Sequence, residues 1–126
     1  PVREGENSQI HFHALFKTPL GFEIAIMPEF FGLKIGKALF QRLRDIQIGD
    51  PEFDSKIHVR GDNASAVQAW LLERRRKDVL MEFFRAHSSA SLDRTGLHYI
   101  DHKERVDFEA FQKTFDLLTS TLRQLE

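Results

Sequence analysis

The last segment of the chain repeats apolar residues at alternating spacings of three and four. They are Phe108, Phe111, Phe115, Leu118, Leu122 and Leu125. That spacing places them on one face of an α-helix, whose first turn Asp107 can cap. The seam is shorter than three heptads, which favours packing against the rest of the chain over a coiled coil. We therefore predict a C-terminal helix whose Phe111, Phe115 and Leu118 all face a sheet.

Patterns typical of strands come earlier in the chain. Apolar and polar residues alternate over residues 10–16 and again over residues 22–27, and a Thr-Pro-Leu-Gly turn separates the two runs. Alternation indicates half-buried strands, and the turn predicts that these two strands pair as a hairpin. Short strands are also predicted at residues 46–48 and 57–60, and a second hairpin is predicted over residues 88–100.

Helical patterns occupy the middle of the chain. Residues 30–45 combine helical spacing with Gly32 and Gly36, which predicts an irregular helix or a loop. Asp62 or Asn63 can cap the helix that follows. Two apolar sets flank the basic run at residues 74–77, so one bent helix and two consecutive helices both fit. The sets are Ala66, Val67, Trp70 and Leu71, and Val79, Leu80, Phe83 and Phe84.

Strands joined by turns, with helices between and after them, predict an α+β fold. We expect an antiparallel sheet built from hairpins and covered on one face by two to three helices, including the C-terminal helix. A length of 126 residues is typical of one domain, so we predict a single domain over residues 9–126 and a flexible arm over residues 1–8. Twelve phenylalanines, with one tryptophan and one tyrosine, predict a dry aromatic core.

Charge and composition argue against several classes of function. Eighteen basic and nineteen acidic residues give a net charge of -1, which supplies no global field to attract nucleic acid. The chain has no cysteine, which excludes disulfides and thiolate metal sites. The most apolar stretch, residues 21–40, contains four charged side chains and predicts no membrane span.

A small polar site is one candidate for chemistry. His11 and His13 are expected to project from one face of a strand, and Asp54 and His58 lie near a later strand. Two histidines at this spacing can chelate a metal, but a zinc site needs three or four converging ligands. Solvent-facing histidines and ordinary acidic turn residues explain the pattern without a ligand. We therefore predict no metal, no cofactor and no catalytic residue.

The strongest local concentration of charge is a run of four basic residues, Arg74, Arg75, Arg76 and Lys77. Such a run can receive nucleic acid, an acidic lipid surface or an acidic partner. Glu73 and Asp78 flank it, however, and Glu73 has the favourable i,i+4 spacing to Lys77. A solvated helix face or a helix junction is therefore the favoured interpretation, with an interaction patch as the alternative.

One motif resembles a group of uncharacterised bacterial domains that share the pattern G-D-P-x-F-D-x-x-[FI]-x-V-x-G-x-D. It consists of Gly49-Asp50-Pro51-Glu52-Phe53-Asp54, followed by Ile57, Val59, Gly61 and Asp62. Those domains share a similar order of helix, strand pair and terminal helix, and they often follow membrane-spanning segments. The resemblance implies the same architecture over residues 20–126, within a larger protein that can be membrane-associated. It implies no activity.

Three functions from different classes fit the sequence. The leading hypothesis is a non-catalytic accessory or interaction domain, on the cytoplasmic or membrane-peripheral side, whose partner is a protein or another domain of the same chain. The second is a small-ligand-binding or enzymatic domain with a Phe-lined pocket and His11, His13 or His58 as its polar group. The third is weak binding of nucleic acid or an acidic partner through residues 74–77. An exposed apolar patch would favour the first hypothesis, and a cavity with convergent polar groups the second.

Overall fold

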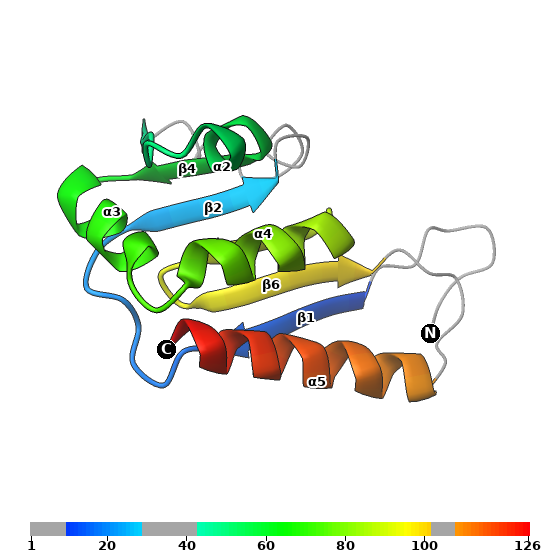
Figure 1. Ribbon diagram of the computed structural model, residues 1–126. Coiled ribbons are helices and arrows are strands. Elements are labelled where there is room, and N and C mark those ends of the chain that lie inside the picture. The colour runs from blue at the N-terminus through cyan, green and yellow to red at the C-terminus, as the bar shows by residue number, and fades with distance from the viewer. Residues whose placement is uncertain (1–9, 29–42, 102–107) are drawn as a thin grey trace.

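The computed structural model describes residues 10–28, 43–101 and 108–126 (Figure 1). The strands in these ranges are β1 (Ile10–Leu15), β2 (Ile24–Pro28), β3 (Arg44–Asp45), β4 (Ile57–Gly61), β5 (Ala90–Asp93) and β6 (Gly96–Asp101). The helices are α2 (Pro51–Lys56), α3 (Ala64–Leu72), α4 (Arg76–Ala86) and α5 (Phe108–Leu125). The predicted arm at residues 1–8, most of the irregular segment at residues 30–45, and the cap at Asp107 lie outside the described residues.

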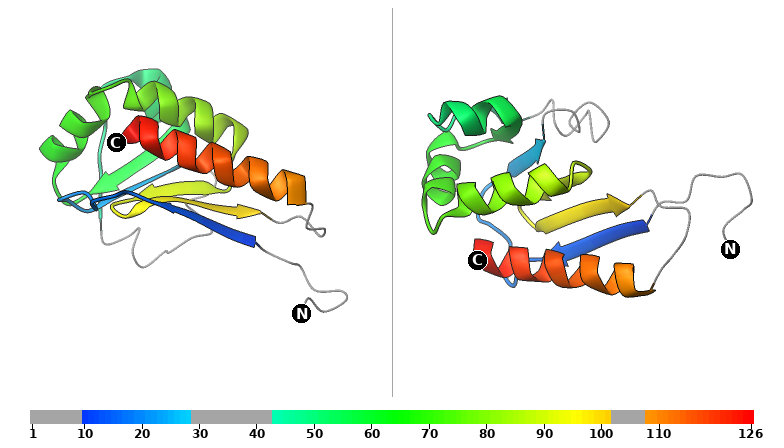
Figure 2. Two further views of the ribbon diagram at one scale, coloured as in Figure 1. Left: turned by 90° about the horizontal axis from the view of Figure 1, so that it is seen from below. Right: turned by 45° about the vertical axis from the view of Figure 1, so that its right-hand side comes forward.

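The described strands form one antiparallel sheet in the order β1-β6-β5-β2-β4-β3. α4 and α5 cross the same face of this sheet, and α3 lies near one end of it (Figure 2). The predicted α+β fold, with an antiparallel sheet covered on one face by helices that include the C-terminal one, is therefore confirmed. The brief strand expected at residues 46–48 is wrong, because the strand of this region is β3 at Arg44–Asp45 and residues 46–48 follow it without strand structure.

The predicted hairpin between the first two strands is wrong. β1 pairs with β6, whereas β2 pairs with β4 and β5. The link between β1 and β2 instead crosses the tip of the β5–β6 hairpin, where Phe16 and Leu20 donate N–H groups to Thr95 and Arg94 at 2.8 and 2.9 Å. A Pro/Gly turn suits such a linker as well as a hairpin, so the local pattern does not decide which strands pair.

The second predicted hairpin is confirmed as β5 and β6. Asp93 Oδ1 shapes its turn by accepting the N–H groups of Thr95 and Gly96 at 2.8 and 3.2 Å. Gly96 has a φ of +152° and lies so close to β1 that a Cβ there would collide with the carbonyl oxygen of Ala14. Only glycine suits this backbone and this neighbour. Gly96 therefore allows the close approach of β1 to β6.

The Gly-Asp-Pro motif folds as a six-residue helix, α2, rather than as the expected turn. Asp50 caps α2, because its side chain accepts the N–H groups of Glu52 and Phe53. Phe53 is fully buried, as expected for a core anchor. Asp54 holds the preceding loop by accepting the N–H groups of Ile48 and Gly49 at 2.9 and 3.0 Å. Asp50 and Phe53 of the motif therefore act as the cap of a helix and as its core residue.

The middle helical region consists of two consecutive helices, which settles the alternative that the sequence leaves open. Asn63, which stands at the last Asp position of the motif pattern, caps α3 by accepting the N–H group of Ala66 at 3.1 Å. Arg74 and Arg75 then take positive φ values of 53° and 58°. This left-handed backbone ends α3 and turns the chain into α4.

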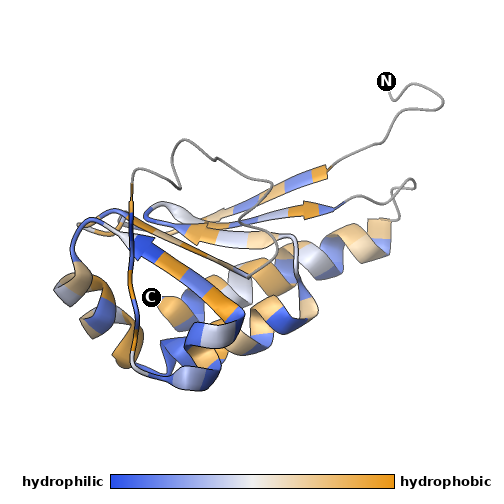
Figure 3. Ribbon diagram, turned by 90° about the horizontal axis from the view of Figure 1, so that it is seen from above, coloured by the Kyte–Doolittle hydropathy of each residue, from blue (hydrophilic) through white to orange (hydrophobic). Residues whose placement is uncertain are grey.

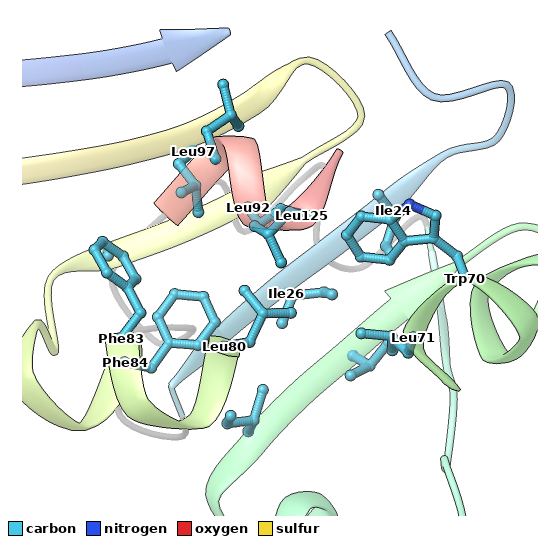
Figure 4. Packing of buried hydrophobic residues seen from close by; sticks show 14 of the residues in the cluster. Ile24, Ile26, Trp70, Leu71, Leu80, Phe83, Phe84, Leu92, Leu97 and Leu125 are labelled. Atoms are coloured by element: carbon cyan, nitrogen blue, oxygen red, sulfur yellow. The ribbon is translucent and has the colours of Figure 1, made fainter. Parts of the chain in front are cut away.

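One large apolar cluster fills the space between the sheet and the helices (Figure 4). Hydrophobic and hydrophilic residues alternate along β4, whose Ile57 and Val59 point into this cluster (Figure 3). β2 is apolar throughout and contributes Ile24 and Ile26. Its buried phenylalanines are Phe12, Phe16, Phe53, Phe83 and Phe84. A second, smaller cluster lies on the opposite face of the sheet and contains Ala25, Met27 and Leu43.

The apolar residues of α5 are buried only in the C-terminal half of the helix. Leu118 is 2% exposed, and Leu122 is also buried, whereas Phe111 and Phe115 are 39% and 48% exposed. The prediction that all three consecutive residues of the seam face the sheet is therefore wrong for Phe115. An α-helix turns 100° per residue, so Phe108 and Phe115 lie at one margin of the apolar stripe, about 60–80° from Leu118. Leu118 lies toward the buried face that it shares with Thr121, Leu122 and Leu125.

Candidate functional site

β1 forms a free edge of the sheet among the described residues. It pairs with β6 on one side only, and the opposite edge strand, β3, has just two residues. Phe16 donates its N–H group toward the β6 side, to Thr95. Alternation along the strand then directs the N–H and C=O groups of His11, His13 and Leu15 outward. These outward groups can bond to one further strand.

Three phenylalanines of α5 lie above this edge. α5 packs mainly on β1 (Figure 1), and the rings of Phe111 and Phe12 are 5.0 Å apart between centroids. Phe108 is the most exposed of the three, at 77%. Leu117, on the other side of α5, lines a hollow shared with α4, so Phe108 and Phe115 face away from α4. We call β1 together with Phe108, Phe111 and Phe115 the edge surface.

The edge surface lacks the usual protection of an edge strand. β1 has the sequence Ile-His-Phe-His-Ala-Leu and contains neither lysine nor proline, the residues that commonly prevent edge-to-edge pairing. The other residues of α5 that line a hollow beside Phe115 are polar or charged, and they include Asp116, Thr119 and Arg123. Exposed phenylalanines within a polar helix surface therefore lie over an unprotected strand.

Three histidines meet at the same edge, on the face of the sheet that points away from the helices. His13 Nδ1 lies 2.6 Å from His98 Nδ1, since these two residues are direct partners in the β1–β6 register. His98 Nε2 lies 3.0 Å from Asp93 Oδ1. The ring of His11 stacks near that of His13, with centroids 6.3 Å apart. The result is a hydrogen-bonded chain that runs from Asp93 through His98 to His13.

The hydrogen bonds between Asp93, His98 and His13 determine which ring nitrogen of each histidine carries the proton. Burial raises the pKa of Asp93, but hydrogen bonds from His98 and Thr95 outweigh this effect. The pKa of Asp93 is therefore lowered from 3.8 to about 2, and its carboxylate accepts hydrogen bonds. His98 therefore donates from Nε2, and its Nδ1 accepts from Nδ1 of His13 when both rings are neutral. Nε2 of His13 remains as the nitrogen at the open end. Burial, together with His98 and His11, lowers the pKa of His13.

A shallow hollow of about 210 Å³ lies over this cluster, and its lining includes His11, His13, Ser89, Ser91, Asp93 and His98. No phenylalanine belongs to that lining. Within the ranges that the structure describes, no group of three or more His, Cys, Asp or Glu side chains is arranged to hold a metal ion. The arrangement can hold and pass a proton or bind a charged side chain.

The ionised form of Asp93 is favoured by the fold, which predicts a pH dependence of stability. A carboxyl group with a lowered pKa stabilises the fold above its ordinary value of 3.8, and that contribution is lost as the pH falls to about 2. We expect Asp93→Asn to be less stable than the parent protein at pH 5, with the difference vanishing near pH 2. Urea unfolding of both proteins at pH 5 and pH 2 measures the difference in their free energies of unfolding. An equal difference at the two pH values would contradict the role given to Asp93.

The basic run at residues 74–77 forms the junction between α3, α4 and the end of α5. Arg76 is 6% exposed, and it donates hydrogen bonds to the carbonyl oxygens of Leu125 and Trp70 at 2.7 and 2.9 Å. Its guanidinium also lies 4.7 Å from the centroid of the Trp70 ring. The expectation of a solvated face is wrong for Arg76. The helix-junction interpretation describes it instead.

The other three basic residues of the run also have partners. Arg74 donates to the backbone oxygen of Glu126 at 3.0 Å. Arg75 lies 3.6 Å from a carboxylate oxygen of Asp78, and Lys77 lies 3.1 Å from one of Asp50. Two of the four residues, Arg74 and Arg76, therefore hold the end of α5, where carbonyl groups point outward.

Loss of the Arg76 guanidinium is expected to destabilise the protein by about 2 kcal/mol, because buried carbonyl groups lose their donors. Arg76→Met keeps an apolar stem and removes the guanidinium with its donors and its charge. Arg75→Met is the matched control, since the Arg75 side chain is 85% exposed, and it should change stability by less than about 0.5 kcal/mol. Equal denaturation midpoints for the two variants would show that Arg76 does not hold the junction.

The remaining predicted site residues do not join the histidine cluster. Asp54 lies on α2 and holds the loop at residues 48–49. His58 lies on β4, opposite Met27 of β2. The strands β2, β5 and β6 therefore separate it from β1. A larger hollow of about 440 Å³ lies between α2 and α4, and its lining carries charges of both signs.

Sequence patterns alone missed the two partners of His13. The alternation of residues 88–100 places Asp93 and His98 on one face of the second hairpin. Their proximity to each other was therefore predictable from the sequence. The contact with His13 depends on the long-range pairing of β1 with β6, for which the sequence carries no local signal.

No family model, curated protein or solved structure matches this chain. Among the described residues, no helix combines the length and apolar character needed to cross a membrane. The described surface is therefore the basis for inferring a function.

Proposed function

We propose that this chain is a non-catalytic interaction domain that adds an extended segment of a partner protein to its sheet at β1. The observation that carries this proposal is the position of three exposed phenylalanines above a strand that, among the described strands, is paired on one side only. An exposed apolar patch beside unsatisfied backbone groups is typical of a protein-binding surface.

An extended segment satisfies both parts of the edge surface. Its backbone can bond to the outward N–H and C=O groups of His11, His13 and Leu15. Every second side chain would then lie on the helix face of the sheet, beneath the flank of α5 that carries Phe108 and Phe115. Apolar side chains at those alternate positions would remove the phenylalanines from water, at about 25 cal/mol for each Å² of apolar surface.

The resemblance of residues 49–62 to bacterial domains supports the wider context of this proposal. Domains of that group often follow membrane-spanning segments, so we place the chain within a larger bacterial protein that can be membrane-associated. The extended segment would then come from a partner protein or from another domain of the same protein.

The two other hypotheses receive less support. The histidine hollow has no phenylalanine in its lining, so the polar group and the apolar pocket of the ligand-binding hypothesis are not combined there. The nucleic-acid hypothesis needs accessible positive charge, but Arg76 is buried and Lys77 is paired with Asp50.

Selection of binders from a library of random twelve-residue peptides tests the proposal. We expect the selected peptides to perturb the NMR signals of β1 and α5 and to lose at least tenfold in affinity against Phe115→Ser. Leu72→Ser is the matched control, because Leu72 is 61% exposed on α3, away from the edge surface. Peptides that bind elsewhere, or that bind Phe115→Ser as tightly as the parent protein, would contradict it.

A further inference from the structure

We propose that the segment docking on β1 carries a carboxylate side chain that binds His13, and that docking therefore tightens as the pH falls from 8 to 6. This inference rests on the proposed function, and it identifies the chemistry of the partner on the face of the sheet opposite α5.

The position of His13 makes it the direct neighbour of an incoming strand. His11 and His13 both lie on β1, and their side chains point to the open face of the sheet. A residue paired with either histidine on a new strand would place its Cβ about 4.5–5.5 Å away. Its side chain would then lie beside His11 or His13, on the same face of the sheet as the hollow of about 210 Å³ that these histidines line.

Hydrogen bonding determines what His13 offers to that side chain. In the neutral state His13 donates from Nδ1 to His98, which in turn donates to Asp93, so Nε2 of His13 carries only a lone pair. A carboxylate cannot donate to this lone pair. Addition of one proton converts Nε2 into a charged donor, which binds a carboxylate strongly.

The charged groups around His13 favour an acidic partner over a basic one. His11 faces His13 from β1 and His98 faces it from β6, and neither imidazole carries a negative charge that would repel a carboxylate. Asp93 is the carboxylate of the cluster, and it is already engaged by His98 and Thr95. Tyr99 is next to His98 along β6, but its ring packs against Phe12 and His87 on the helix face of the sheet. A carboxylate from outside would complete the charge pairing.

The direction of the pH effect follows from proton linkage. In the free protein, burial and the neighbouring histidines lower the pKa of His13 below 6.5. A bound carboxylate raises that pKa, so the complex holds a proton that the free protein has released. Affinity then increases as the pH falls through this range, by about tenfold for each unit by which binding raises the pKa.

Three nine-residue peptides provide the test. Each has valine at alternate positions, with glutamate, glutamine or lysine between the valines, and affinities are measured by fluorescence anisotropy at pH 8 and pH 6. We expect the Val/Glu peptide to bind about tenfold more tightly at pH 6 than at pH 8. We expect no such change for the Val/Gln peptide. His13→Asn should remove the pH response of the Val/Glu peptide, and His58→Asn, on a distant strand of the same sheet, should preserve it.

The outcomes separate this inference from the proposed function. Equal pH responses for the Val/Glu and Val/Gln peptides, or tighter binding of the Val/Lys peptide at both pH values, would overturn the carboxylate inference and leave docking at β1 intact. Binding of all three peptides that is unaffected by Phe115→Ser, or no binding of any of them, would contradict docking at the edge surface and the inference with it.

Discussion

Gly96→Ala is expected to destabilise the protein by about 2–6 kcal/mol, the largest effect that we predict for a single methyl group. Alanine at a φ of +152° carries backbone strain of about 1–3 kcal/mol. Its Cβ would also collide with the carbonyl oxygen of Ala14 and with the backbone of Leu15, and overpacking of this kind costs about 1–3 kcal/mol more. Backbone atoms cannot move aside as the end of a side chain can, so β1 would have to shift away from β6.

Gly21→Ala is the matched control for this substitution. No atom lies within 4 Å of a Cβ built at Gly21, and that residue has no positive φ. We expect urea denaturation to show a stability change below about 1 kcal/mol for Gly21→Ala. A Gly96→Ala protein as stable as the parent would mean that β1 does not pass as close to the β5–β6 turn as the structure has it.

Leu118→Ala is expected to cost about 3 kcal/mol, because truncation of a buried leucine loses transfer free energy and leaves a cavity. Phe115→Ala, one turn earlier on the same helix, should cost less than about 1 kcal/mol, since nearly half of the Phe115 side chain is already exposed. The larger residue is thus predicted to matter less for stability.

Thermal denaturation of the two variants distinguishes a buried seam from a docking surface. A sharp loss of stability in Phe115→Ala, equal to that of Leu118→Ala, would show that the phenylalanine belongs to the core. It would then be unavailable to a partner. Retained stability combined with lost peptide binding is the result expected of a docking residue.

Patterns that depend on neighbouring residues predicted much of the fold. The β5–β6 hairpin and the seam of α5 were both found, because their turn residues and their spacing act within a short stretch of chain. The pairing of β1 was not found, since a turn at residues 18–21 specifies no partner strand. The approach of β1 to β6 depends on Gly96, about eighty residues later.

The candidate site was predictable only in part, for the same reason. His11 and His13 were assigned to one strand face, but their partners His98 and Asp93 are brought to them by long-range pairing. The exposure of Phe115 was not predictable from its spacing either. A helical repeat identifies the apolar stripe of α5, whereas the sheet beneath it decides how much of that stripe is covered.

Amide hydrogen exchange of β1 in the free protein tests the central claim most directly. Phe12 and Ala14 direct their N–H groups to β6, and His11, His13 and Leu15 direct theirs outward. We predict slow exchange for the first two amides and exchange at least tenfold faster for the other three. Addition of a docked peptide should slow the three outward amides to the rate of the inward pair. Equal protection of all five amides before any partner is added would contradict a free edge at β1.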